Sequence, residues 1–257
     1  MAKNQILPGA ESYFLKGGKT GCILTHGFTC TPEEMRSLAD YLVGKGFSAY
    51  GVRLSGHGTQ PKDLANVTWQ NWLEDIKKAY KEVKKKCDKV FLIGQSLGGM
   101  LSIMGAGVLL VDGVVALSTP YLNYTNKDLL SHIFLDWTRP MIHKVGVKEH
   151  PDWGIRREKD YPAYAAYPQQ VFRQIYALSI ALKDTLPYVK SPVLLLQSKN
   201  DDTIPSNSMT RFQKRLKNTD VETVLLEGFR HGITMDQKRD EAFKIIDEFL
   251  NAKTTQK

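Results

Sequence analysis

The sequence has few of the features that mark secreted, metal-binding or membrane-spanning proteins. Its only cysteines are Cys22, Cys30 and Cys87, an odd and scattered set that suits reduced, mostly buried thiols rather than a disulfide framework. It has no Cys-x-x-Cys pair and no paired histidine spacing, so we expect no metal. No apolar run is long enough to cross a bilayer, and the N-terminal stretch lacks the apolar core of a signal peptide. These absences predict a cytoplasmic protein without stable membrane insertion.

The basic residues outnumber the acidic ones, but they form no pattern typical of nucleic-acid binding. The formal net charge is +8, which raises the question of a nucleic-acid partner. The one dense run, Lys84-Lys85-Lys86, closes a helical pattern that begins near Trp69, where lysines complement the negative end of the helix. No helix-turn-helix, zinc-finger or RNP-like signature is present. We therefore expect no nucleic-acid partner, while a weak attraction to anionic membrane surfaces and a homo-oligomer stay open.

What is present is an alternation of short apolar strands and helical segments. The expected strands cover residues 21–25, 48–52, 90–93, 114–117, 193–196 and 221–226, and the expected helices begin near residues 32, 68, 97, 207 and 236. Strands separated by helices imply crossover connections and a mostly parallel sheet with helices on both faces. The sequence therefore predicts an α/β protein of single-domain size.

A stretch of about seventy residues interrupts this alternation. Residues 121–190 are aromatic, punctuated by proline and predominantly helical in character, and they are too many for a plain connection. We expect a core formed by residues 1–120 and 191–257, with residues 121–190 inserted as a cap. Met141 and the aromatic residues of the cap are expected to form mainly the core of the cap, with a few lining an apolar pocket. These aromatic residues are Tyr121, Tyr124, Phe134, Trp137, Tyr161, Tyr164, Tyr167 and Phe172. Tyr161, Tyr164 and Tyr167 have helical spacing.

The first predicted helix carries a recognisable start signal. Thr31 is expected to be its N-cap, with Pro32 at the first helical position. Glu34, three residues after Thr31, is expected to complete a capping box.

The expected strand 90–93 runs directly into the pattern Gly-x-Ser-x-Gly, centred on Ser96. An apolar helical stretch follows, from about residue 97 to 110. Such a sharp strand-to-helix turn strains the backbone of its central residue and lifts that side chain clear of the sheet. Gly94 and Gly98 lack the Cβ atoms that would clash there. A glycine-rich turn without chemistry is the alternative, but the flanking strand and helix favour Ser96 as a nucleophile.

A serine hydroxyl needs a base, a group that orients the base, and donors for the developing oxyanion. Outside the expected cap, His231 is the only histidine downstream of Ser96, and it follows the last predicted strand. The acid is expected after the preceding strand, where Asp201 and Asp202 are neighbours that the residues alone do not separate, with Asp236 a remote third choice. The backbone N–H of Leu97, directly after the nucleophile, is one expected oxyanion donor.

Five motifs in order resemble the α/β-hydrolase superfamily, specifically bacterial serine carboxylesterases and monoacylglycerol lipases. They are His26-Gly27-Phe28-Thr29, Arg53-Leu54-Ser55-Gly56-His57-Gly58, Gly94-Gln95-Ser96-Leu97-Gly98-Gly99, Asp201-x-x-Ile204-Pro205 and His231. The resemblance selects Asp201, four residues before the proline, as the acid, and it implies the Phe28 N–H as the second oxyanion donor. It also implies that His26 and His57 hold loops. Gln95 and Arg230 depart from the residues most often found at their positions, but neither removes a catalytic group.

We therefore expect a serine hydrolase that cleaves carboxylic esters through an acyl-enzyme, with Ser96, Asp201 and His231 as the triad and Phe28 and Leu97 as oxyanion donors. The substrate is expected to be a small-molecule ester with a short- to medium-chain acyl group, with monoacylglycerols as further candidates. No cofactor is implied. The alternatives are a thioesterase or lysophospholipase on the same triad and, from another class, a ligand-binding protein that keeps a vestigial triad.

Overall fold

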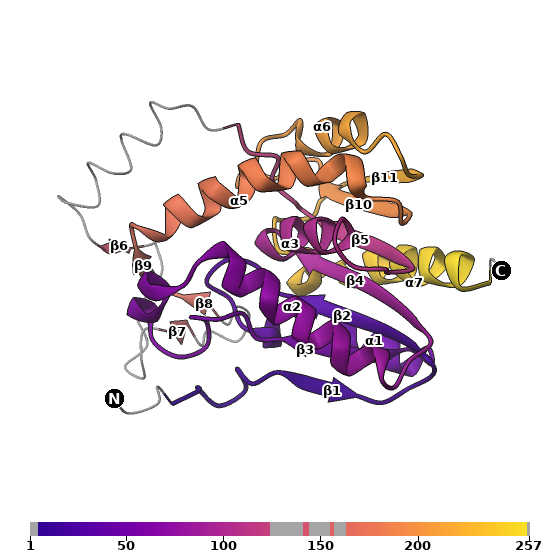
Figure 1. Ribbon diagram of the computed structural model, residues 1–257, viewed down its shortest axis with the longest axis horizontal. Coiled ribbons are helices and arrows are strands. Elements are labelled where there is room, and N and C mark those ends of the chain that lie inside the picture. Colours follow the sequence, from indigo (N-terminus) through magenta and orange to yellow (C-terminus); the bar gives the residue numbers. More distant parts are fainter. Residues whose placement is uncertain (1–4, 124–140, 144–154, 157–162, 256–257) are drawn as a thin grey trace.

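The computed structural model describes residues 5–123, 141–143, 155–156 and 163–255. Seven strands form one sheet in the order β1-β3-β2-β4-β5-β10-β11 (Figure 1). The strands are β1 (Tyr13–Leu15), β2 (Thr20–Thr25), β3 (Ser48–Val52), β4 (Lys89–Gln95), β5 (Gly113–Leu117), β10 (Val193–Ser198) and β11 (Val221–Leu226). Only β1 pairs antiparallel in this sheet, and all other pairs are parallel. The predicted mostly parallel sheet is confirmed, whereas β1 was not predicted.

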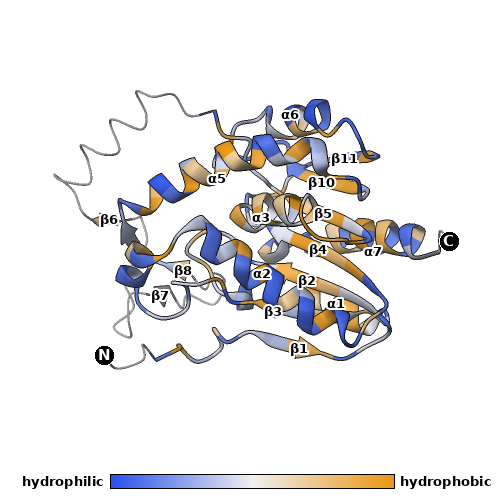
Figure 2. Cartoon of the chain, in the orientation of Figure 1, coloured by the Kyte–Doolittle hydropathy of each residue, from blue (hydrophilic) through white to orange (hydrophobic). Residues whose placement is uncertain are grey.

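Helices cover both faces of the sheet, as the alternation predicted. The helices are α1 (Arg36–Gly44), α2 (Trp69–Lys84), α3 (Leu97–Ala106), α5 (Val171–Thr185), α6 (Ser208–Arg215) and α7 (Arg239–Thr255). Side chains of α1 and α7 pack on one face, and those of α2, α3, α5 and α6 pack on the other. The inner strands, covered on both sides, are therefore almost continuously apolar; in Figure 2 hydrophobic residues dominate β4 and β10, while α2 alternates.

Several predicted boundaries shift for local reasons. The helix after Ser96 ends at Ala106 rather than near residue 110, with Gly107 as its C-cap. The last helix begins at Arg239 rather than Asp236, because a short 3-10 turn, η4 (Ile233–Met235), precedes it.

The helix start predicted at Thr31 is confirmed for the N-cap and for Pro32 but not for the capping box. Thr31 is the N-cap of a 3-10 turn, η1 (Pro32–Met35), with Pro32 at its first position. The capping box is wrong, because the Thr31 side chain makes no capping hydrogen bond. The Glu34 carboxylate instead accepts the backbone N–H of Gly27. A tertiary contact has therefore replaced the expected local one.

The described part of the cap segment is less helical than expected. Beside α5 the structure describes short strands: β6 (Met141–His143), β7 (Ile155–Arg156), β8 (Ala163–Tyr164) and β9 (Ala166–Pro168). Helical spacing of the tyrosines is therefore the wrong interpretation for Tyr164 and Tyr167. Tyr164 is held extended because its N–H donates to Thr29 O and its hydroxyl contacts the loop after β3.

Four of the predicted cap aromatics lie outside the described residues: Tyr124, Phe134, Trp137 and Tyr161. Of the others, Tyr121 and Tyr164 are buried and Met141 is exposed. The division of the chain into core and cap stays a prediction. In the described part of the chain no helix is long and apolar enough to span a membrane. Cys22, Cys30 and Cys87 are buried and are not joined by disulfide bonds.

Candidate active site

Ser96 occupies a strained turn between β4 and α3. Its φ of 55° and ψ of −113° lie outside the usual regions for a residue with a side chain. The turn has no room for a side chain at either glycine. A Cβ atom on Gly94 would collide with the carbonyl of Gly98, and a Cβ atom on Gly98 would collide with the carbonyl of Thr25. The Ser96 N–H donates to Leu117 O at 2.8 Å. The glycine pattern therefore acts as the sequence predicted, holding one serine at the carboxyl edge of the sheet.

The predicted base and acid lie in direct contact. His231 Nδ1 lies 2.8 Å from Asp201 Oδ2 and 3.0 Å from Oδ1. The two residues meet because β10 and β11 are parallel neighbours, so the loops after them leave the same edge of the sheet. The Asp201 side chain is fully buried, and the His231 side chain keeps 17% of its surface exposed. A carboxylate only accepts, so Nδ1 carries the proton and Nε2 of the neutral ring is left as a hydrogen-bond acceptor.

The Asp201 carboxyl is ionised despite its burial. Burial raises its pKa, but the hydrogen bond from His231, the charge of that ring, the Thr203 N–H and the Ser118 hydroxyl together hold the pKa below its ordinary value. The Thr203 N–H lies 2.9 Å from Asp201 Oδ1. The carboxylate is therefore available to orient His231 throughout the neutral range.

The competing acids are engaged elsewhere. Asp202 is exposed, and its carboxylate accepts the Thr203 hydroxyl at 3.3 Å. Asp236 accepts the backbone N–H groups of Arg230 and Lys238 at 2.9 and 3.0 Å. The structure thus brings Asp201 to His231, as the resemblance implied, and gives Asp236 a role in the loop before α7.

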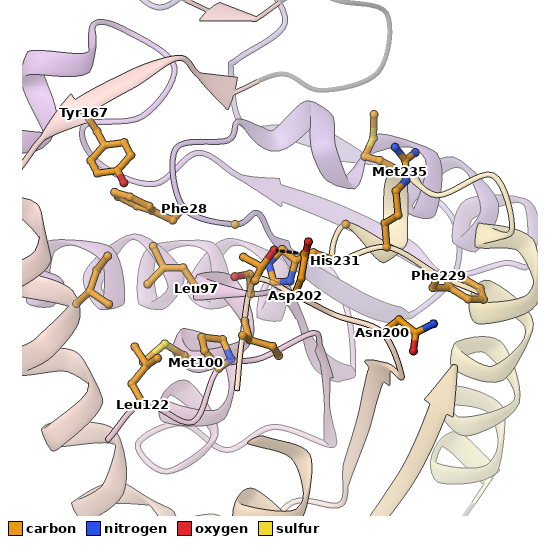
Figure 3. Close-up of a pocket in the computed structure, with 18 of the residues that line it drawn as sticks. Phe28, Leu97, Met100, Leu122, Tyr167, Asn200, Asp202, Phe229, His231 and Met235 are labelled. Carbon is orange, nitrogen blue, oxygen red and sulfur yellow. Dashed lines mark hydrogen bonds between the residues drawn. The ribbon is translucent and has the colours of Figure 1, made fainter. Parts of the chain in front are cut away.

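A cavity of about 1010 Å³ contains both Ser96 and His231 in its wall. Figure 3 shows Phe28, Leu97, Met100, Leu122 and Tyr167 on one side of His231, and Asn200, Phe229 and Met235 on the other. The first side is apolar except for the hydroxyl of Tyr167. Its aromatic rings pack edge to face, with centroids 5.0 Å apart for Phe28 and Tyr167.

The loop after β2 leaves one backbone donor for an oxyanion. The Gly27 N–H donates to Glu34 Oε2 at 2.5 Å, and the Thr29 N–H donates to His57 Nε2 at 3.1 Å. Within the described residues no acceptor is found for the N–H of Phe28 or for that of Leu97, and both residues line the cavity with Ser96. These are the two donors that the sequence analysis named.

Three buried polar side chains that the sequence analysis did not assign to the site connect its loops. Glu34 holds Gly27, and its backbone carbonyl accepts the Thr234 hydroxyl at 2.9 Å. Gln95, fully buried beside Ser96, donates from Nε2 to the His231 carbonyl at 2.8 Å. The loop after β2, the turn at Ser96 and the loop after β11 are therefore joined by buried hydrogen bonds. The only sign of these three residues in the sequence is that each is a polar residue inside an apolar or helical pattern.

Replacing Glu34 with alanine is expected to lower kcat roughly a hundredfold, since a displacement of about 1 Å in a reacting group costs that much. It should also lower the free energy of unfolding by about 2 kcal/mol, because the Gly27 N–H loses a charged acceptor. Glu34→Gln is the control, since its side-chain oxygen still accepts. Steady-state kinetics and chemical denaturation measure both effects. Wild-type kcat in Glu34→Ala would contradict the positioning role.

His26 and His57 are fully buried beside one another, with ring centroids 5.0 Å apart. His26 Nδ1 lies 2.8 Å from Gly27 O, and Nε2 accepts the Leu54 N–H at 3.2 Å. Two such bonds require a neutral ring with the proton on Nδ1. Both histidines therefore hold the loops after β2 and β3, as the resemblance implied.

The burial of His26 predicts acid-sensitive stability. Burial and Arg53 lower its pKa from 6.5 to about 4, against the opposing effect of the Gly27 carbonyl. As the pH falls, the unfolded chain binds a proton on His26 before the folded chain does. The free energy of unfolding is therefore at its full value above about pH 6.5, and it decreases by about 3 kcal/mol as the pH falls to about 4. Denaturation curves of wild type and His26→Gln across this range measure the difference. Parallel curves would contradict the prediction.

The mostly parallel sheet and the strained serine between β4 and α3 are typical of the α/β-hydrolase fold. The profile of the serine aminopeptidase S33 family matches residues 18–238. The chain belongs to this family.

Related proteins are similar to this chain over nearly its whole length. The chain is 27% identical to a thermostable monoacylglycerol lipase of Bacillus sp. (strain H-257), covering 90% of each chain. It is 23% identical to a carboxylesterase of Bacillus subtilis (strain 168), covering 93% of this chain and 96% of the relative. A solved structure from work on the metagenome-derived lipolytic enzymes LipS and LipT matches with a TM-score of 0.85 at 27% identity, covering 96% of this chain and all of the other. These likenesses confirm the predicted fold, the resemblance to the carboxylesterase and monoacylglycerol lipase group, and the prediction of a carboxylic ester hydrolase.

Proposed function

We propose that the chain hydrolyses short- to medium-chain acyl esters, monoacylglycerols included, through an acyl-enzyme formed on Ser96. The observation that carries this proposal is the pair of His231 and Asp201, 2.8 Å apart, in a cavity whose wall also contains Ser96. The names of the two Bacillus relatives, a monoacylglycerol lipase and a carboxylesterase, support the substrate class.

In the proposed first half-reaction, His231 Nε2 removes the proton of Ser96 as its oxygen attacks the ester carbonyl. The N–H groups of Phe28 and Leu97 hold the oxyanion. Asp201 keeps the proton of His231 on Nδ1 and stabilises the imidazolium that forms. His231 then gives its proton to the departing alcohol.

In the second half-reaction His231 takes a proton from water, which attacks the acyl-enzyme at the same carbonyl carbon. The tetrahedral intermediate collapses, the proton returns to Ser96, and the carboxylic acid leaves. The apolar wall of Phe28, Leu97, Met100 and Tyr167 is proposed to hold the acyl chain, because burial of each methylene contributes about 0.8 kcal/mol.

The test is hydrolysis of a ladder of p-nitrophenyl esters from acetate to palmitate, beside a 1-monoacylglycerol, with Ser96→Ala as control. Turnover that needs Ser96 and peaks at short or medium chains supports the proposal, and strong monoacylglycerol turnover extends it to the lipase substrate. Faster cleavage of acyl thioesters than of matched oxygen esters would support the thioesterase alternative. No Ser96-dependent turnover on any of these would refute the proposal.

A further inference from the structure

A cluster of cations lies between α5 and α6, outside the active site. Lys183 of α5 places its Nζ 5.5 Å from the centroid of the Tyr121 ring, and Arg211 of α6 places its guanidinium carbon 5.8 Å from the same centroid. Arg215 follows Arg211 by one helical turn. We call these three cations, Lys183, Arg211 and Arg215, the α5–α6 basic surface.

No ion pair or side-chain hydrogen bond of these three cations occurs within the described residues. Some other described cations have acidic partners, such as Lys85 with Glu82 at 2.6 Å and Lys199 with Glu227 at 2.8 Å. The α5–α6 basic surface therefore carries charge that the described fold does not neutralise.

The three charges also repel one another. The pKa of Lys183 is lowered by partial burial and then by Arg215 and Arg211, and Asp184 offsets only part of this. Arg211 and Arg215 form a like-charged pair four residues apart on one helix, which is mildly destabilising. An anion placed between the helices would relieve this repulsion.

Exposed apolar side chains accompany the cations. Ile180 lies three residues before Lys183 on α5 and is 45% exposed, and Tyr188, in the 3-10 turn η3 (Leu186–Tyr188), is 68% exposed. Cations interspersed with exposed aliphatic and aromatic side chains are typical of helices that lie in the interface of a membrane. A free phosphate or a nucleic acid would leave Ile180 in water, so this composition favours a lipid surface.

The surface also connects to the active-site cavity. Tyr121 carries two of the cations on its ring, and its chain neighbours Pro120 and Leu122 both line the cavity. Docking on the α5–α6 side would therefore hold the cavity close to esters carried in the lipid.

We propose that the α5–α6 basic surface binds the anionic phospholipid surface of a membrane. Binding is peripheral, driven by lipid phosphates at Lys183, Arg211 and Arg215, with Ile180 and Tyr188 entering the interface. Because the cations neutralise lipid charge, binding weakens as salt is added.

The test is cosedimentation of the full chain with vesicles of phosphatidylglycerol and phosphatidylcholine, compared with vesicles of phosphatidylcholine alone. Replacing all three cations with glutamine (Lys183→Gln, Arg211→Gln and Arg215→Gln) is expected to lower the partition coefficient on anionic vesicles about a hundredfold, from about fivefold for each charge near the surface. The control variant is Lys16→Gln, Lys62→Gln and Lys81→Gln, which removes the same charge from exposed positions elsewhere. Thermal unfolding checks that both variants fold.

Loss of binding in the first variant with retention in the control supports the proposal. Equal losses in both variants would assign the effect to net charge and overturn it, as would wild-type binding that ignores lipid charge. Stabilisation of the wild type by inorganic phosphate, lost in the first variant and without vesicle binding, would identify a free-phosphate site instead. Binding is repeated with Ser96→Ala, so the outcome does not depend on the proposed hydrolysis.

Discussion

Replacing Ser96 with alanine is expected to lower kcat by about four to six orders of magnitude, with a residual rate above that in water. The substitution removes the oxygen that forms the acyl-enzyme. It leaves the donors of Phe28 and Leu97 and the cavity in place, so substrate still binds. The measurement is a steady-state and single-turnover assay with the best ester of the ladder. A burst of alcohol release should accompany acylation in the wild type only.

Ser102 offers a matched control for this experiment. Its hydroxyl is buried on α3, six residues after Ser96, and has no hydrogen-bond partner among the described residues. Ser102→Ala is therefore expected to keep nearly wild-type kcat, since it removes a similar oxygen from the same helix. Thermal unfolding checks that both variants keep the fold. Comparable activity in Ser96→Ala and wild type would exclude Ser96 as the nucleophile.

Replacing Asp201 with asparagine is expected to lower kcat by about four orders of magnitude. The asparagine amide can donate to His231 Nδ1, and this bond moves the ring proton to Nε2. In that tautomer Nε2 cannot accept the proton of Ser96. The 2.8 Å contact with His231 is thus predicted to act by selecting a tautomer rather than by holding the loop alone.

Asp202→Asn is the control at the neighbouring position, since Asp202 is exposed and its carboxylate accepts from Thr203. It is expected to keep kcat within about tenfold of wild type. Measuring kcat and KM separately is informative, because a tautomer effect falls on kcat. A larger loss in Asp202→Asn than in Asp201→Asn would transfer the role of the acid to Asp202.

Local rules were sufficient for the elbow and for most of the sheet. The pattern around Ser96 could be interpreted from sequence because Gly94 and Gly98 meet steric limits that depend on a few neighbouring residues. The parallel strands were predictable because burial on both faces makes each one continuously apolar. Strand order after Ser96 then placed His231 after the last strand, at the edge where the serine lies.

Side-chain direction required the tertiary structure. Asp201 and Asp202 are adjacent on one loop and chemically identical, and only the fold turns one toward His231 and the other toward solvent. Glu34 suited a capping box, yet its carboxylate accepts from Gly27, seven residues earlier, because the loop after β2 folds back over η1. The capping pattern covers only the residues from Thr31 to Glu34, so it does not report a donor seven residues before Glu34.

The sequence alone therefore determined the parallel α/β core, the strained turn at Ser96 and the position of His231 after the last strand, because these depend on local sterics and on burial. The tertiary structure decided which carboxylate meets His231, how Glu34 and Gln95 join the three loops, and that Tyr164 and Tyr167 lie on strands. It also gathered Lys183 and Arg211 around Tyr121 and brought Arg215 near Lys183. Each of these depends on contacts between residues far apart in the chain, which the packing of the whole fold alone brings together.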